Sequence, residues 1–167
     1  MASQVTGYSA TQMALHWVVV FLVAFQFLVH DAMETSWRAF TRGQPAPDDI
    51  AILTYAHVGA GILVLLLAMA RIYLRLTRGA PEAPADEPRL MRWSGEAIHA
   101  LIYLLLFLLP LSGIAAWFFG VKLAASAHEL MTNVMLGAIA LHIAGALFQH
   151  FVRRSDVLMR MFLPERS

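Results

Sequence analysis

The stretch HELMTNVMLGAIALH, from His128 to His142, decides the fold class of this sequence. It lies within an apolar segment from Ala127 to Val152. Crossing a hydrocarbon core of about 30 Å takes roughly 20 mostly apolar helical residues, so this segment is long enough to span a membrane. Residues fourteen apart lie within about 40° of one helix face and about 21 Å apart along the axis. One helix therefore offers two imidazoles at two depths.

Three further segments have the same character, and they run from Met13 to His30, from Ile50 to Tyr73 and from Ala97 to Phe119. The whole chain has 59% hydrophobic against 14% charged residues, which is far from the balance of a soluble domain. We predict an all-α integral membrane four-helix bundle. It forms one domain over residues 1–167, surrounded by membrane lipid.

The polar segments between these helices predict the topology. The linkers 43–49 and 78–89 are rich in proline and charge, as surface loops are. No Lys or Arg precedes Arg38, so the first segment is expected to be a retained helix rather than a cleaved signal. Nine basic residues lie around the second loop and in the C-terminal tail, and only Arg38, Arg42 and Lys122 lie elsewhere. The nine are Arg71, Arg75, Arg78, Arg89, Arg92, Arg153, Arg154, Arg160 and Arg166. The positive-inside rule then places both termini in the cytoplasm.

Composition also excludes several kinds of site and partner. The chain has no cysteine, which rules out disulfides, thiolate zinc sites, cysteine-ligated iron–sulfur clusters and covalently attached c-type haem. A net charge of +1 gives no electrostatic reason to expect nucleic acid as a partner. Any cofactor must be held by histidine, methionine or oxygen.

All seven histidines lie in or at the ends of the apolar segments, where a polar ring is a functional candidate. With alternating helix directions, His57 and His128 fall near the periplasmic side, and His16 and His142 fall near the cytoplasmic side. Spacing alone does not select these four histidines. His30 could replace His57 opposite His128, and His99 could compete as a ligand at the cytoplasmic side.

A pair of histidines suits haem better than zinc. Two imidazoles leave a tetrahedral metal two ligands short, whereas a porphyrin supplies four nitrogens itself. Arg71 and Arg75 are expected to pair with haem propionates, or else only to mark the topology. Five glycines in the apolar segments either permit close helix contact or make room for a flat ligand. They are Gly59, Gly61, Gly113, Gly137 and Gly145.

Five short motifs contain six of the seven histidines: LHW at Leu15 to Trp17, AHVGAGI at Ala56 to Ile62, IHALIYLLL at Ile98 to Leu106, AHE at Ala127 to Glu129 and LHIAGALFQH at Leu141 to His150. With these motifs the sequence resembles the prokaryotic cytochrome b561 family over essentially its whole length. In that family four histidines on helices one, two and four bind two b haems, which implies His16, His57, His128 and His142 as the axial ligands here. His99 and His150 match family positions that are not axial ligands, and either could belong to a quinone site or form a structural hydrogen bond. His30 matches no position of the pattern.

The resemblance implies electron transfer between a periplasmic donor or acceptor and the quinone pool, with ubiquinone as substrate, in the bacterial inner membrane. Some relatives oxidise superoxide, although the predicted outer loops of this chain are net acidic and would not steer an anion inward. The alternative is a haem-b relay subunit docked to a periplasmic dehydrogenase or hydrogenase. A haem-free ion or proton carrier is a third hypothesis.

Topology reporters test the predicted orientation. A reporter fused after Ser167 or inserted in the 78–89 loop should be cytoplasmic, because nine basic residues flank these positions and three flank the others. A reporter near Gly43 should be periplasmic. A periplasmic signal from the C-terminal fusion would invert the orientation and the depth of every histidine.

Overall fold

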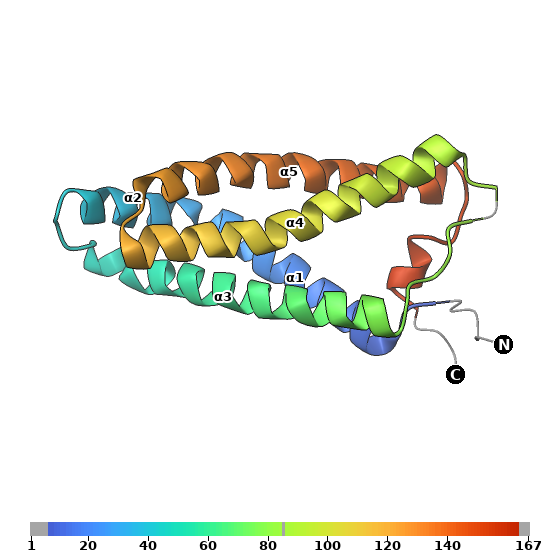
Figure 1. Ribbon diagram of the computed structural model, residues 1–167, viewed down its shortest axis with the longest axis horizontal. Coiled ribbons are helices and arrows are strands. Elements are labelled where there is room, and N and C mark those ends of the chain that lie inside the picture. Colours follow the sequence, from blue (N-terminus) through green and yellow to red (C-terminus); the bar gives the residue numbers. More distant parts are fainter. Residues whose placement is uncertain (1–6, 85, 164–167) are drawn as a thin grey trace.

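The computed structural model describes residues 7–84 and 86–163, and it is all-α (Figure 1). Four long helices lie side by side along the long axis of the molecule, which confirms the predicted fold class. The long helices are α1 (Ala10–Leu28), α3 (Asp48–Thr77), α4 (Arg89–Phe119) and α5 (Lys122–Phe151), and the short ones are α2 (His30–Thr41) and a 3-10 turn (Met159–Met161).

The four long helices are each long and apolar enough to cross a membrane. Their outer faces carry large apolar side chains with little cover: Phe21 is 70% exposed, Ile52 75% and Leu123 80%. A surface of this kind is unfavourable in water and favourable against lipid tails. The chain is therefore a multi-pass membrane protein.

Local signals in the sequence set where the helices begin. At the start of α1, the backbone N–H of Gln12 donates to Ser9 Oγ, and the Gln12 side chain accepts from the backbone N–H of Ser9, forming a capping box. Both α3 and α4 follow a proline, and α3 places Asp48 and Asp49 in its first turn. Those two carboxylates lie at the positive end of the helix dipole and extend α3 beyond the predicted start at Ile50.

The long helices form two closely packed pairs. α1 packs along α3, α4 packs along α5, and contacts between α3 and α4 join the two pairs. The fully buried core is small and comprises Val19, Val64, Ala68, Leu105, Leu106 and Met135. In α5, Met135 lies midway between His128 and His142, so a dry apolar layer separates the two depths at which these histidines lie.

Helix α2 was not predicted, because its sequence is too polar to span a membrane and reads as part of a loop. It packs on α3 and lies across one end of the bundle (Figure 1). The fully buried hydroxyls of Ser36 and Thr54 form a 2.6 Å hydrogen bond that fixes it there. The ring of Phe40 stacks on Trp37 and also contacts Trp117 of α4, closing this end with aromatic side chains.

At the other end the loop 78–88 and the C-terminal segment meet. The Arg153 guanidinium donates to Asp86 Oδ2 at 2.8 Å, and the Arg160 guanidinium donates to the carbonyl oxygen of Glu82 at 2.7 Å. The buried side chain of Gln149 donates to the Glu87 carboxylate. These contacts connect the end of α5 to the loop that precedes α4.

The first helix joins the same polar network. Gln12 donates to the carbonyl oxygen of Gly79 at 3.0 Å, and the indole N–H of Trp17 donates to the carbonyl oxygen of Met161 at 3.0 Å. Both described chain ends therefore lie beside the loop 78–88 (Figure 1). The predicted basic residue Arg166 lies outside the described residues. That this end faces the cytoplasm stays a prediction.

Candidate functional site

Four of the predicted histidines form two ring pairs. His16 of α1 lies opposite His142 of α5, with ring centroids 6.4 Å apart and planes at 58°. His57 of α3 lies opposite His128 of α5, with centroids 6.4 Å apart and planes at 59°. Each pair joins one of the packed helix pairs to the other, and α5 contributes one ring to each.

The distance between the two ring centroids of each pair can be compared with that of two imidazoles bound to one metal. A metal–imidazole bond is about 2 Å long and the ring centroid lies about 1.1 Å behind the nitrogen, so two trans imidazoles on one metal have centroids about 6.3 Å apart. Both pairs have this spacing. The rings of His99 and His142 lie only 4.9 Å apart, edge to face, which leaves no room for a metal between them.

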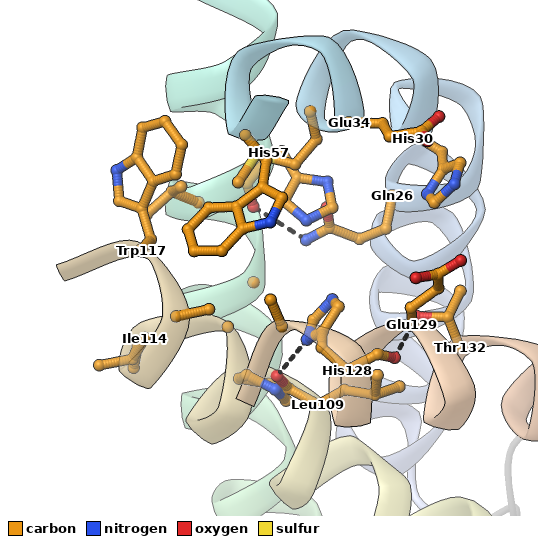
Figure 2. A pocket seen from close by; sticks show the side chains of 18 of the residues that line it. Gln26, His30, Glu34, His57, Leu109, Ile114, Trp117, His128, Glu129 and Thr132 are labelled. Carbon is orange, nitrogen blue, oxygen red and sulfur yellow. Dashed lines mark hydrogen bonds between the residues drawn. The ribbon is translucent and has the colours of Figure 1, made fainter. Parts of the chain in front are cut away.

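A backbone carbonyl fixes the tautomer of His128. Its Nδ1 lies 2.9 Å from the carbonyl oxygen of Leu109 (Figure 2). It also lies 3.1 Å from Ser112 Oγ. Because a carbonyl oxygen only accepts, the proton must be on Nδ1. The lone pair of Nε2 is then available to a metal, the usual arrangement for a ligating histidine.

Gly113 allows this contact. A Cβ added at Gly113 would lie 3.3 Å from His128 Cε1 and 3.4 Å from Nδ1, closer than ordinary van der Waals contact. The missing side chain lets the imidazole reach the backbone of α4 one turn earlier, at Leu109. Gly113 also lines the cavity beside His57 and His128, so both roles predicted for the glycines stay open at this position.

The other histidine of this pair is held through its main chain. Gln26 of α1 reaches across to α3, and its Nε2 donates to the carbonyl oxygen of His57 at 3.0 Å (Figure 2). The Nδ1 atoms of His16 and His57 are buried without a hydrogen-bond partner in the described part of the chain. Buried polar atoms of this kind are typical of sites completed by a bound group.

A cavity of about 430 Å³ opens beside His57 and His128 (Figure 2). Its size is within the range of cofactor pockets, and most of its wall is apolar or aromatic, including Trp37 and Trp117. The polar residues of the wall include His30, Glu34, Lys122, Ser126, Glu129 and Thr132. His30 is exposed and begins α2, and its ring has no contact with His128 comparable to that of His57.

The charges around this cavity partly cancel. Arg38 donates to the carboxylate of Glu34, and this hydrogen bond holds the pKa of Glu34 below its usual value. Glu34 is therefore ionised at neutral pH and its charge is balanced by Arg38. Lys122 and Glu129 are the other charged residues of the wall, so the cavity carries no excess of positive charge.

The second ring pair is surrounded by basic and aromatic groups. Arg71 lies close enough to His16 and His142 to interact electrostatically with both, and its guanidinium lies over the Tyr103 ring, 5.6 Å from the centroid. Arg75 interacts in the same way with His99. The structure thus brings Arg71 to this pair and Arg75 to the neighbouring His99.

His99 and His150, the other two predicted site residues, differ in position. His99 Nδ1 donates to the carbonyl oxygen of Gly95 at 2.8 Å, which leaves its Nε2 free beside His142. His150 is half-buried, two turns beyond His142 on α5, and its ring contacts Phe151. Only His99 contacts the ring pair directly.

A bare metal ion does not fit either pair. Over residues 7–84 and 86–163, no group of three or more histidine, aspartate or glutamate side chains could hold one. A cofactor that brings its own equatorial ligands needs only two imidazoles. The ring spacing of both pairs and the cavity beside His57 and His128 fit such a group.

Comparison with known proteins agrees with this geometry. The family model for prokaryotic cytochrome b561 matches residues 7–164. This chain belongs to the prokaryotic cytochrome b561 family. It is 32% identical to cytochrome b562 of Cereibacter sphaeroides, over 97% of this chain and 99% of the relative. It is 28% identical both to cytochrome b561 homolog 1 of Escherichia coli and to the probable superoxide oxidase CybB of Yersinia pestis, in each case over 96% of this chain and 98% of the relative. Membership of a cytochrome b family implies haem b.

Three contacts of the site were missed by sequence reasoning. The carbonyl oxygen of Leu109 and the hydroxyl of Ser112 contact His128 from another helix, which no spacing rule predicts. Gln26 did carry a signal, because a glutamine in the middle of an apolar span needs a hydrogen-bond partner. Its partner, the main chain of His57, requires the structure.

Replacing Gly113 with alanine tests the close contact. The added methyl should push the His128 ring away from Leu109, an overpacking that costs about 1–3 kcal/mol. We expect haem affinity at this site to fall roughly tenfold, which corresponds to about 1.4 kcal/mol. Haem per chain, measured by absorbance during extraction with a competing haem-binding protein, reports the loss.

Gly95→Ala is the matched control on the same helix. A Cβ at Gly95 meets no atom within 4 Å, so this variant gains only the higher helix propensity of alanine. Equal haem retention in the two variants would show that the Gly113 contact does not matter.

Proposed function

We propose that this protein is a dihaem b-type membrane cytochrome that carries single electrons between a periplasmic partner and the quinone pool. His57 with His128 would bind the outer haem, and His16 with His142 the inner one. The observation that carries the proposal is the equal 6.4 Å ring separation in two independent pairs.

The rival ligands receive less support. His30 begins α2 and is exposed at the cavity wall, while His57 holds the position opposite His128. The ring of His99 packs edge-on against His142 at 4.9 Å, as a neighbour rather than as a trans partner. A haem-free ion carrier is not favoured either, because family membership implies haem.

Haem b bound by these histidines would supply a one-electron couple, which suits electron transfer rather than oxygen binding. The protein's own contribution is to hold the rings and exclude water. α5 fixes the two sites about 21 Å apart along its axis, with the apolar layer around Met135 between them. At the outer site the Leu109 carbonyl orients His128.

Arg71 and Arg75 would bind the propionates of the inner haem. Both arginines interact electrostatically with histidines of this region, and Arg71 is half-buried. Guanidinium groups suit planar carboxylates because they donate two parallel hydrogen bonds. The same positive charges also favour a cytoplasmic location for this end.

Quinone would react at the inner end, where His99 and His150 lie. The Nε2 of His99 accepts in the tautomer that donates to Gly95, so it is a suitable partner for a quinol hydroxyl. A separate question is which molecule exchanges electrons with the protein at the outer face. The name of the Yersinia pestis relative suggests superoxide, whereas the balanced charges of the outer cavity give no steering of an anion and suit a neutral donor or a docked redox protein equally.

Alanine variants of the four histidines test the ligation. His57→Ala or His128→Ala should remove or convert the outer haem and leave the inner one, while His16→Ala or His142→Ala should do the reverse. The reason is that each pair lies at its own depth and shares no ring with the other. Reduced-minus-oxidised spectra and haem per chain measure the outcome.

His30→Ala and His99→Ala are the controls and should keep two low-spin haems. Folding of each variant is checked by size-exclusion chromatography, since an empty cavity destabilises a bundle. If His30→Ala lost a haem while His57→Ala kept both, the ligands of the outer haem would have to be His30 and His128. A wild-type protein without a reducible b-type band would remove the cytochrome proposal altogether.

A kinetic test addresses the quinone end. His150→Ala should slow reduction of the haems by ubiquinol several-fold without changing haem content, because His150 lies beyond His142 toward the proposed quinone site. Stopped-flow absorbance of the haem band measures the rate. Unchanged kinetics in a fully loaded variant would count against His150 and leave His99 as the candidate.

A further inference from the structure

Gln26 is the only glutamine within the apolar core of α1, and it lies against the outer histidine pair (Figure 2). Burying an amide in an apolar bundle is unfavourable unless its polar atoms have partners. One of them does: Nε2 donates to the carbonyl oxygen of His57 at 3.0 Å. The other, Oε1, is buried and has no partner in the described part of the chain.

The orientation of this amide is fixed by its contact. The carbonyl oxygen of His57 accepts only, so the nitrogen of Gln26 must face it and the amide cannot be reversed. Oε1 is therefore an acceptor that lacks a donor. His57, whose main chain Gln26 contacts, has the complementary defect, because its Nδ1 is also buried without a partner among the described residues.

Gly61 makes this arrangement possible. It lies one turn after His57 on α3, and a Cβ there would approach Gln26 Nε2 to 3.3 Å. The geometry repeats that of the opposite ring, where Gly113 lies one turn after Leu109 and admits the His128 imidazole to the Leu109 carbonyl. In both places a glycine leaves room for a side chain to bond the carbonyl one turn earlier.

We propose that Gln26 is a positioning residue for His57, with its Nε2 holding the main chain of His57 and its Oε1 accepting a hydrogen bond from the Nδ1–H of the same residue. This proposal rests on the proposed haem ligation by His57. The second bond, which is not formed in this structure, would select the tautomer that leaves Nε2 of His57 available to the haem iron. It would also make the ring a stronger electron donor, since an acceptor on the second nitrogen raises the basicity of a ligating histidine.

A stronger donor stabilises ferric over ferrous iron, so loss of the acceptor should raise the reduction potential. For Gln26→Leu, which is close in size and lacks both polar atoms, we expect a roughly tenfold shift of the outer haem toward the reduced form. For a one-electron couple this is about 59 mV. Potentiometric titration of the purified protein measures both haems, and the inner one serves as an internal reference.

Gln26→Glu tests rescue. A carboxyl at this depth is held neutral, and its O–H and C=O groups can reproduce the donor and the acceptor. We expect the outer potential to return most of the way to the wild-type value, together with the wild-type low-spin ferric resonance. A role limited to packing would predict that leucine and glutamate behave alike.

Alanine substitutions at Gly61 and Gly59 give a test that leaves Gln26 in place. Gly61→Ala pushes on Gln26 Nε2 and should raise the outer potential by a smaller amount, whereas Gly59→Ala meets no atom within 4 Å and should leave it unchanged. If Gln26→Leu fails to accumulate, this pair decides the question. Equal potentials in the Gly61 and Gly59 variants would overturn the proposal.

Failure of this inference is distinguishable from failure of the proposed function. The outer haem is identified as the one lost in His57→Ala, so full haem content in that variant would refute the ligation itself. Loss of haem in His57→Ala, combined with an unshifted outer potential in a fully loaded Gln26→Leu protein, would refute only the role of Gln26.

Discussion

An imidazole has two ring nitrogens, and inside an apolar bundle neither can rely on water. The surroundings of the site histidines differ in how they satisfy these nitrogens. At His128 one nitrogen donates to the Leu109 carbonyl and the other faces a cavity. At His16 and His57 a buried nitrogen has no partner within the described protein. Each of these rings therefore needs an acceptor for its Nδ1, while its Nε2 is the atom available to the proposed cofactor.

The fold was largely predictable because membrane spans depend on length and apolarity, and the sequence carries both over four segments. The loop at 78–89 is found nearly as predicted, between Thr77 and Arg89. Helix α2 was missed for the opposite reason. Its stability comes from packing on α3 through Ser36 and from aromatic contacts of Phe40, and neither has a local sequence signature.

The site was predictable to the extent that helical spacing and resemblance select histidines. Spacing placed His128 and His142 near one face of one helix, and the structure sets each of them opposite a histidine named by the resemblance. Spacing could not choose between His30 and His57, because that choice depends on where α1 ends and how α3 packs. Nor could it find Gln26 or the purpose of Gly61, since both depend on contacts between helices.

Both ring pairs take one member from α5, the last of the long helices. During synthesis the first three spans can enter the membrane and pack with no complete site among them. Binding of a cofactor between the proposed pairs would therefore follow insertion of Lys122–Phe151. Maturation thus has a built-in order: in a chain that stalls before its final span, His16 and His57 lack the rings that lie opposite them in the complete fold.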